Sequence, residues 1–260
     1  MHSRLFALSL VLAFSAASCG GGSQPASTTQ EAAAPAAAPV DPATVATISG
    51  IVSFEGAAPA NAPIRMNADP YCLTVNKTPQ AQETYMVKDG KLANAFVYVQ
   101  DGLGGRTFTA PTAPVVLNQE NCRYHPHVFG IMVGQPLEIL TSDPTLHNIH
   151  ATPKGNTEFN TAQPIKGMKM QHLFTTKEIM VPFKCDVHGW MNAYVGVLDH
   201  PYFAVTAEDG SFSIKNLPPG TYTLAAWHEK AGTKTISVTV AAKETKADAN
   251  FSFSAPAAGN

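Results

Sequence analysis

The chain has 260 residues and a formal net charge of −2; 14% of its residues are charged and 45% are hydrophobic. It shows no basic stripe of the kind that binds nucleic acid, and no cluster of cations that would hold an anionic membrane by charge. Beyond a low-complexity N-terminal stretch, roughly 210 residues remain, which is enough for two small domains with a core each. Composition therefore excludes a nucleic-acid-binding protein and favours a small globular pair of domains.

The first 18 residues have the pattern of a secretory signal peptide. Arg4 precedes an apolar run from Leu5 to Ala17, which is too short for a membrane span. The sequence Ala16-Ala17-Ser18-Cys19 resembles a bacterial lipobox, in which the cysteine becomes the lipidated first residue of the mature protein. Ordinary signal cleavage, which would leave Cys19 free, is the alternative. The resemblance implies a lipid-anchored protein of the bacterial cell envelope that faces the periplasm, with the outer membrane as its expected location.

A linker follows the signal. Residues 20–44 consist mainly of Gly, Ser, Ala, Pro, Thr and Gln. This composition buries too little apolar surface to fold, so we interpret residues 19–44 as a lipidated cysteine and a disordered linker. Where proline extends it, such a linker spans roughly 3 Å per residue. It would let a folded module meet partners at a distance from the membrane.

From residue 45 onward the sequence predicts strands and shows no sustained helical periodicity. Asp89-Gly90 is typical of tight hairpins, and it separates the strand-like stretches 84–88 and 92–100. The predicted fold class is therefore all-β. The other predicted strands are residues 47–54, 115–117, 128–133, 137–140, 178–183, 193–198, 203–206, 212–214, 217–224 and 236–240.

Three metal-ligating side chains lie in one short segment. Cys185, His188 and Met191 follow one another with two residues between each pair. A thiolate, two imidazoles and a weak axial thioether form the trigonal copper site of electron-transfer proteins, so one more histidine completes the set. His147 and His150 are available upstream, and their odd spacing puts them on opposite faces of a strand. A catalytic Cys-His pair would give Met191 no role, and structural zinc would need a Cys or His in its place.

A histidine followed by asparagine, upstream of a Cys-x-x-His loop, is found here as His147-Asn148. This arrangement resembles the blue copper proteins, or cupredoxins, and the loop ending Trp190-Met191 is most similar to their amicyanin subgroup. The resemblance covers residues 105–200 and favours His147 over His150. It implies a Greek-key β-sandwich with one copper ion, cycling between Cu(I) and Cu(II), at His147, Cys185, His188 and Met191.

Neighbours of these ligands have expected roles as well. By the same resemblance, Asn148 would join the two ligand segments through hydrogen bonds, with a turn-capping role as the alternative. His188 would be the ligand nearest the solvent and the exit for electrons. Phe183, two residues before the cysteine, would face the core on the copper side. Trp190 would belong either to an apolar docking patch or to buried packing.

After residue 200 the pattern changes to short strands, interrupted by Asp209-Gly210 and by Pro218-Pro219-Gly220-Thr221-Tyr222. This section resembles the carboxypeptidase regulatory-like domains, which are small transthyretin-like sandwiches. Residues 48–52 and 92–99 resemble the opening strands of that fold. We therefore expect one sandwich of residues 45–104 and 201–254, split by the cupredoxin of residues 105–200. The alternative is three sequential pieces, with residues 45–104 as an extension of the cupredoxin.

The chain has four cysteines. If Cys19 carries a lipid and Cys185 binds the metal, Cys72 and Cys122 remain as a pair in a compartment that permits disulfides. The sequence thus predicts a Cys72–Cys122 disulfide. Two separately buried thiols are the alternative, because sequence does not give the distance between them.

Two further groups are open as sites for a second copper ion. Met168, Met170 and His172 alternate on one side of a possible strand and would suit Cu(I), although flexible packing explains them as well. His125 and His127 flank a proline, and a polar strand entry explains them as well as metal binding does.

The predicted function is that of a periplasm-facing type 1 (blue) copper protein that carries single electrons between unidentified periplasmic redox proteins. It is not expected to be an enzyme, because four protein ligands leave no position for a substrate. A copper-binding or trafficking lipoprotein without electron transfer is the first alternative, and structural copper in an adhesion or scaffold module is the second. Reversible redox cycling, Cu(I) transfer to an acceptor, or loss of folding without copper would distinguish the three.

Overall fold

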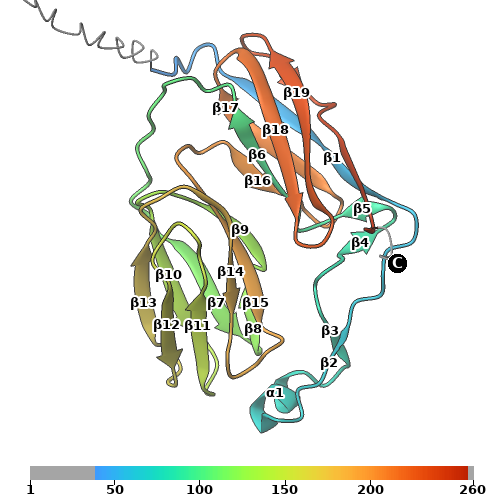
Figure 1. The fold of residues 1–260 in the computed structure, drawn as a ribbon, viewed down its shortest axis with the longest axis vertical. Helices are drawn as coiled ribbons and strands as arrows, with labels where there is room; N and C mark the ends of the chain where they lie inside the picture. The colour runs from blue at the N-terminus through green and yellow to red at the C-terminus, as the bar shows by residue number, and fades with distance from the viewer. Residues whose placement is uncertain (1–38, 257–260) are drawn as a thin grey trace, which may run out of the picture. The chain divides into compact units, whose positions relative to one another are not determined.

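The structure is a computed structural model, and it describes residues 39–256. Nearly all of its regular elements are strands, which form two β-sandwiches, so the all-β prediction is confirmed (Figure 1). The predicted signal peptide, Cys19 and most of the linker lie outside the described residues. Within residues 39–256, no helix has the length and apolar character needed to cross a membrane.

The first sandwich combines strands from both ends of the described chain. One sheet has the order β17-β1-β5-β4, with β20 and β21 also paired to β1, and the other has the order β16-β6-β18-β19. Strands from before residue 104 and after residue 200 thus share both sheets, although the exact domain boundaries stay a prediction. The strands are β1 (Ala46–Glu55), β4 (Val87–Lys88), β5 (Lys91–Leu92), β6 (Phe96–Asp101), β16 (Phe203–Val205), β17 (Ser211–Leu217), β18 (Gly220–His228), β19 (Gly232–Val240), β20 (Thr245–Lys246) and β21 (Phe251–Ser254).

The second sandwich is built from the chain between these two parts. Its sheets have the orders β13-β10-β7-β8 and β12-β11-β14-β15-β9, and buried aliphatic and aromatic side chains fill the space between them. Because β11, β14 and β15 are neighbours, segments far apart in sequence end side by side. The strands are β7 (Val115–Glu120), β8 (Arg123–His125), β9 (Val128–Met132), β10 (Pro136–Thr141), β11 (His147–Ala151), β12 (Phe159–Gln163), β13 (Lys169–Leu173), β14 (Glu178–Lys184) and β15 (Asn192–Leu198).

A small cluster of buried residues joins β6 and β18 to β9 and β15. Gly130 and Gly196 lie opposite each other in the β9–β15 pair, and a methyl group on either would overlap an aromatic ring. The ring is that of Phe203 at Gly130 and that of Phe96 at Gly196. Both positions therefore require glycine, because the aromatic side chains of the first sandwich pack directly on the backbone of the second.

The predicted hairpin of residues 84–88 and 92–100 is wrong in its second half. Asp89 and Gly90 do form the expected tight turn, with φ of 50° and 70°, but they join only the short strands β4 and β5. Asn94 then adopts a left-handed conformation, with φ of 60°, and turns the chain away. As a result β6 pairs with β16 and β18 in the other sheet.

Between β1 and β4 the chain leaves the first sandwich. It forms the small sheet of β2 (Pro63–Ile64) and β3 (Gln80–Ala81) and the helix α1 (Pro70–Val75). Six residues are too few to show helical periodicity, which is why the sequence analysis missed α1. The usable signal was Asp69 before Pro70: the aspartate accepts hydrogen bonds from two backbone N–H groups of the first turn, and proline fits the first helical position.

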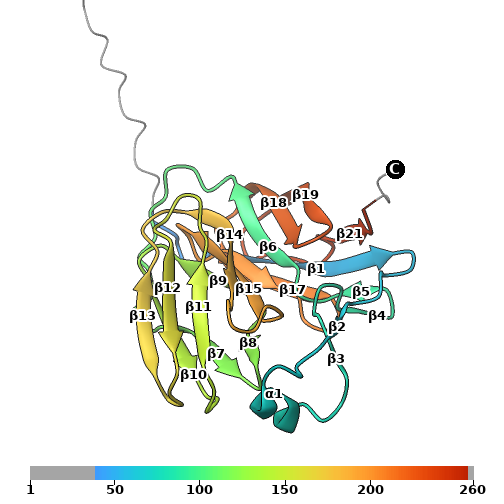
Figure 2. The same cartoon turned by 60° about the horizontal axis from the view of Figure 1, so that its bottom comes forward.

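A disulfide ties α1 to the second sandwich. It joins Cys72 of α1 to Cys122 in the turn between β7 and β8, so the predicted pairing is confirmed. Figure 2 shows α1 beside the end of β7. Asn121 and Cys122 both have positive φ, 53° and 58°, in this turn. Asp143 holds the turn by accepting both of their backbone N–H groups, at 2.9 and 2.8 Å. The segment carrying α1 is thereby placed against the end of β11.

His200 is buried at the end of the second sandwich in a neutral state. Its Nε2 donates to the carbonyl of Val99 at 2.9 Å, and its Nδ1 accepts the N–H of Tyr202 at 3.2 Å. Burial lowers the pKa of this imidazole to about 4. The hydrogen bond to Nδ1 exists only while that nitrogen is unprotonated.

Candidate metal centre

The second sandwich brings the two predicted ligand segments to one end of neighbouring strands. His147 is the first residue of β11, and Cys185 follows the last residue of β14. Since β11 and β14 pair antiparallel, with His150 opposite Lys184, the start of β11 faces the loop that leaves β14. Met191 lies directly before β15, so the loop from Cys185 to Met191 is held at both ends by the same sheet.

Three donor atoms converge in the interior. Nδ1 of His147 lies 2.9 Å from Nδ1 of His188, and Sγ of Cys185 lies 4.0 Å from the latter nitrogen. One donor atom of each residue lies within 4.8 Å of the others, and none of the three residues is more than 2% exposed. A cation with bonds of about 2 Å fits between donors roughly 3–4 Å apart. The residues therefore fit a metal ion, and a thiolate with two imidazoles suits copper or zinc.

Met191 closes the loop beside these donors. Its N–H donates to the carbonyl of His188 at 2.8 Å, and its carbonyl accepts the N–H of Cys185 at 3.1 Å. The residue is 1% exposed and belongs to the same core cluster as Cys185. A buried thioether, unlike a fourth Cys or His, is the weak ligand of a copper site.

The surroundings of Cys185 favour its thiolate form. Burial alone would raise the pKa of the thiol, but hydrogen bonds from His147 and His188 outweigh burial and lower the pKa to about 6. The backbone N–H of His188 also points at Sγ, at 3.3 Å. A thiolate is the form in which cysteine binds a metal ion.

His147 is oriented by a buried carboxylate. Its Nε2 lies 2.9 Å from Oδ2 of Asp143, and both side chains are almost completely buried. Burial would lower the pKa of His147, but the hydrogen bond with Asp143 and the contact with Cys185 raise it to about 8. Because Asp143 occupies Nε2, the other nitrogen of the ring is left to face the donor cluster. Asp143 was not predicted from the sequence, although its position four residues before His147 was a usable signal.

His188 has a matching partner on its far side. Its Nε2 lies 3.0 Å from Oδ2 of Asp69, which also accepts the hydroxyl of Thr145 at 2.7 Å. The ring of Trp190 lies 4.9 Å from that of His188, and His188 is only 2% exposed. His188 is still the most exposed of the four predicted ligands, but α1 and its capping Asp69 cover the imidazole. Its role as the exit for electrons stays a prediction.

Asn148 connects the two ligand segments. Its Oδ1 accepts the N–H of Asp186 at 2.7 Å and lies 3.2 Å from Sγ of Cys185. Its Nδ2 donates to Asn160 on the neighbouring strand β12 at 2.7 Å. His150 lies elsewhere: its nitrogens bond to Asp186 at 2.8 Å and to Glu158 at 2.9 Å. The structure thus brings His147, and not His150, to the cluster.

Phe183 and Trp190 both pack near the centre. Phe183 is 1% exposed, and its ring centroid lies 6.1 Å from those of Phe129 and Phe159 in the core. Trp190 is half-buried, and its Nε1 donates to the carbonyl of Cys122 at 3.0 Å. Trp190 therefore fills the space between His188 and the turn that carries the disulfide.

The two other histidine groups are engaged in different contacts. Nε2 of His127 bonds to Glu229 at 2.8 Å and its Nδ1 to the carbonyl of Asn192 at 3.1 Å, so both nitrogens are occupied. His172, on β13, stacks on Phe159 with 4.1 Å between ring centroids. Nε2 of His172 is buried and has no hydrogen-bond partner among the described residues. Both groups therefore stay predictions as sites for a second copper ion.

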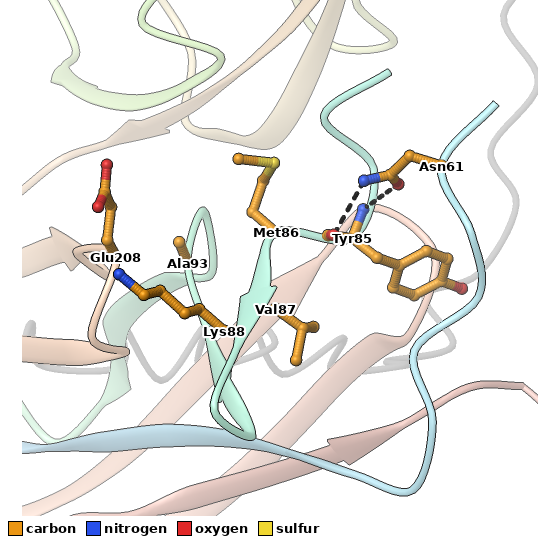
Figure 3. A pocket seen from close by; sticks show the side chains of 7 residues that line it. All are labelled: Asn61, Tyr85, Met86, Val87, Lys88, Ala93 and Glu208. Atoms are coloured by element: carbon orange, nitrogen blue, oxygen red, sulfur yellow. Dashed lines mark hydrogen bonds between the residues drawn. The ribbon is translucent and has the colours of Figure 1, made fainter. Parts of the chain in front are cut away.

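A pocket of about 380 Å³ lies in the first sandwich beside β4. Asn61 holds its edge by bonding to both the N–H and the carbonyl of Tyr85, at 2.8 and 3.0 Å (Figure 3). The pocket's lining contains none of the predicted ligands. It is lined by Asn61, Tyr85, Met86, Val87, Lys88, Ala93 and Glu208.

Comparison with known proteins gives three results. The family model of the carboxypeptidase regulatory-like domain matches residues 191–254, ten of which (191–200) lie in the stretch predicted as cupredoxin. A search of curated proteins finds no similar protein. Several solved structures are similar to part of the chain.

Three of these structures serve as examples. A reduced amicyanin mutant is 21% identical, with a TM-score of 0.29, over 34% of this chain and 85% of its own. A purple cupredoxin from Nitrosopumilus maritimus is 22% identical, with a TM-score of 0.28, over 33% and 98%. The Cu-containing nitrite reductase of Thermus scotoductus SA-01 is 16% identical, with a TM-score of 0.32, over 58% and 28%. The chain is thus similar to amicyanin and other cupredoxins over part of its length, and to the carboxypeptidase regulatory-like domain over residues 191–254.

Proposed function

We propose that this protein binds one copper ion and carries single electrons. His147, Cys185 and His188 would hold the ion, and the thioether of Met191 would be a fourth, weaker ligand. The observation that carries the proposal is the convergence of two imidazole Nδ1 atoms and a low-pKa thiol in a buried position beside a methionine. A copper ion held by such a set supplies reversible one-electron transfer between Cu(I) and Cu(II).

The protein's own contribution is to hold the ligands in place. Asp143 and Asp69 fix the two imidazole rings through their outer nitrogens, and Asn148 joins the two ligand segments. A carboxylate on the far nitrogen of a histidine also makes its near nitrogen a stronger donor. These contacts would hold the ligand side chains in place and so limit their rearrangement between oxidation states.

The remaining parts of the proposal concern the whole protein. Four protein donors would leave no position for a substrate, so we propose a carrier and not an enzyme. The signal and lipobox pattern supports a lipid anchor at Cys19 in the bacterial cell envelope. The partners would then be redox proteins of the periplasm.

The test is a titration of the purified full chain with Cu(II), followed by visible and electron paramagnetic resonance spectroscopy. We expect one equivalent to bind with an intense thiolate-to-copper band that a reductant bleaches reversibly. His147→Ala should abolish the band, and the matched control His150→Ala, three positions along the same strand, should keep it. Binding without the band in the unaltered chain would refute the type 1 site. A bound ion that does not cycle but passes as Cu(I) to an acceptor would favour copper trafficking instead.

A further inference from the structure

A second group of donor atoms lies on the Nε2 side of His188, where the proposed copper site does not use it. Sγ of Cys72 lies 3.8 Å from this nitrogen, and Oδ2 of Asp69 lies 3.0 Å from it. One donor atom of each of these three residues lies within 4.8 Å of the others. In the oxidised chain the sulfur of Cys72 is bonded to that of Cys122. The group therefore becomes a soft donor set only when the disulfide is reduced.

The two cysteines are held together by more than their sulfur atoms. Nδ2 of Asn76, at the end of α1, donates to the carbonyl of Cys72 and to that of Asn121, each at 3.0 Å. The hydroxyl of Tyr71 donates to Asp143 at 2.9 Å, and Asp143 also accepts the N–H of the cysteine in the β7–β8 turn. These bonds link α1 to the turn independently of the disulfide. Reduction would thus leave two thiols side by side, on Cα atoms 5.7 Å apart in the oxidised chain.

We propose that the reduced chain binds one Cu(I) ion between the thiolates of Cys72 and Cys122, with Nε2 of His188 as the third donor. Both cysteines are fully buried, and a pair of thiolates selects soft ions. Nε2 of His188 would exchange its contact with Oδ2 of Asp69 for the ion, while Asp69 would keep its hydrogen bonds to two N–H groups of α1 and to the hydroxyl of Thr145. Three donors suit Cu(I) better than zinc, whose structural sites take four.

The step needs a dithiol as reductant. Through a mixed disulfide, two electrons and two protons pass to Cys72 and Cys122, and the reductant becomes a disulfide. Cu(I) then displaces the two thiol protons, together with any proton on Nε2 of His188, and its oxidation state does not change. The ion would lie across one imidazole ring from the proposed copper site. This inference goes beyond the proposed function, because it adds a second site that thiol reduction opens.

The test uses the full chain with Cys19→Ser and Cys185→Ser, which keeps only Cys72 and Cys122 of the four cysteines. Cu(I) is titrated without oxygen against a chromophoric Cu(I) chelator, before and after reduction. We expect no tight binding before reduction and one equivalent after it. A matched control with Cys72→Ser and Cys122→Ser added should bind none, and circular dichroism shows whether each variant keeps its β-structure. Reoxidation of the loaded chain should release the ion, a measurement that needs no further variant.

Binding of less than half an equivalent of Cu(I) by the reduced chain would overturn the site. Binding of as much Cu(I) by the control as by the reduced chain would overturn it as well. Zinc that displaces Cu(I) at equal concentration would overturn the choice of ion. Since Cys185 is replaced in every arm, its thiolate contributes to none of these outcomes.

Discussion

The carboxylate of Asp69 offers a direct way to test how the protein tunes the proposed copper ion. In Asp69→Asn the N-cap of α1 is preserved, because asparagine is as good a cap as aspartate, but the negative charge on Nε2 of His188 is lost. The pair is well shielded, with the side chain of His188 3% exposed and that of Asp69 15% exposed. The charge favours Cu(II) over Cu(I), so its removal should raise the reduction potential.

The size of the change in reduction potential follows from the role of carboxylates that hydrogen-bond to metal-bound histidines. Losing a group that orients a metal-bound histidine weakens metal binding roughly tenfold to a hundredfold. If the loss falls on Cu(II) alone, each tenfold change raises a one-electron potential by about 59 mV, so we expect a rise of roughly 60–120 mV. Protein-film voltammetry of the copper-loaded variant measures the shift directly.

Thr145→Val is the matched control. It removes the other hydrogen bond to Oδ2 of Asp69, at 2.7 Å, and keeps the carboxylate on His188. We expect less than half the shift of Asp69→Asn. A variant that retains its thiolate-to-copper band but shows an unchanged or lowered potential would refute the reasoning, since the charge would then have no influence on the ion.

Three further predictions concern stability. The pKa of buried His200 is about 4 in the folded chain and about 6.5 when unfolded, so its contribution to the unfolding free energy is complete above pH 6.5 and is lost as the pH falls toward 4. In urea unfolding, this group should make the free energy of unfolding about 2 kcal/mol smaller at pH 5 than at pH 7. His200→Gln should lack this part of the pH dependence. In Gly130→Ala the added methyl group overlaps an aromatic ring, so the unfolding free energy should fall by about 1–3 kcal/mol. Gly105 has open space around it, so Gly105→Ala should change the unfolding free energy by less than about 0.5 kcal/mol, and equal effects of the two substitutions would contradict the packing. The disulfide joins two cysteines that are 50 positions apart in the sequence. In the chain-entropy model, replacing Cys72 and Cys122 by alanine should therefore lower the unfolding free energy of the metal-free chain by about 4 kcal/mol. An unchanged denaturation midpoint would contradict this.

Local patterns predicted much of this protein. The strand-like run of residues 47–54 anticipated β1, and the spacing of Cys185, His188 and Met191 identified a loop that the structure closes by backbone hydrogen bonds. Such features depend on a few neighbouring residues. They are therefore readable from a single sequence.

Long-range contacts were not readable in the same way. Asp69 lies 119 positions before His188, and nothing in the sequence near either residue indicates that they meet. The burial of His188 was missed for this reason, because the covering helix comes from the first part of the chain. Asn94 shows the opposite failure: one left-handed residue in an otherwise strand-like stretch sends β6 to another sheet.

The position of β1 has a consequence for how the chain folds as it is made. β1 pairs with β17, β20 and β21, which lie more than 150 residues later, so the first sandwich is incomplete until β21 has been synthesised. The second sandwich has all its strands, and α1 before them, within the first 198 residues. Domains tend to fold as units in the order of synthesis, so we expect the ligand cluster to assemble while β1 still waits for its partners. Pulse proteolysis of chains arrested after residue 200 would show a protected second sandwich and a cleavable β1.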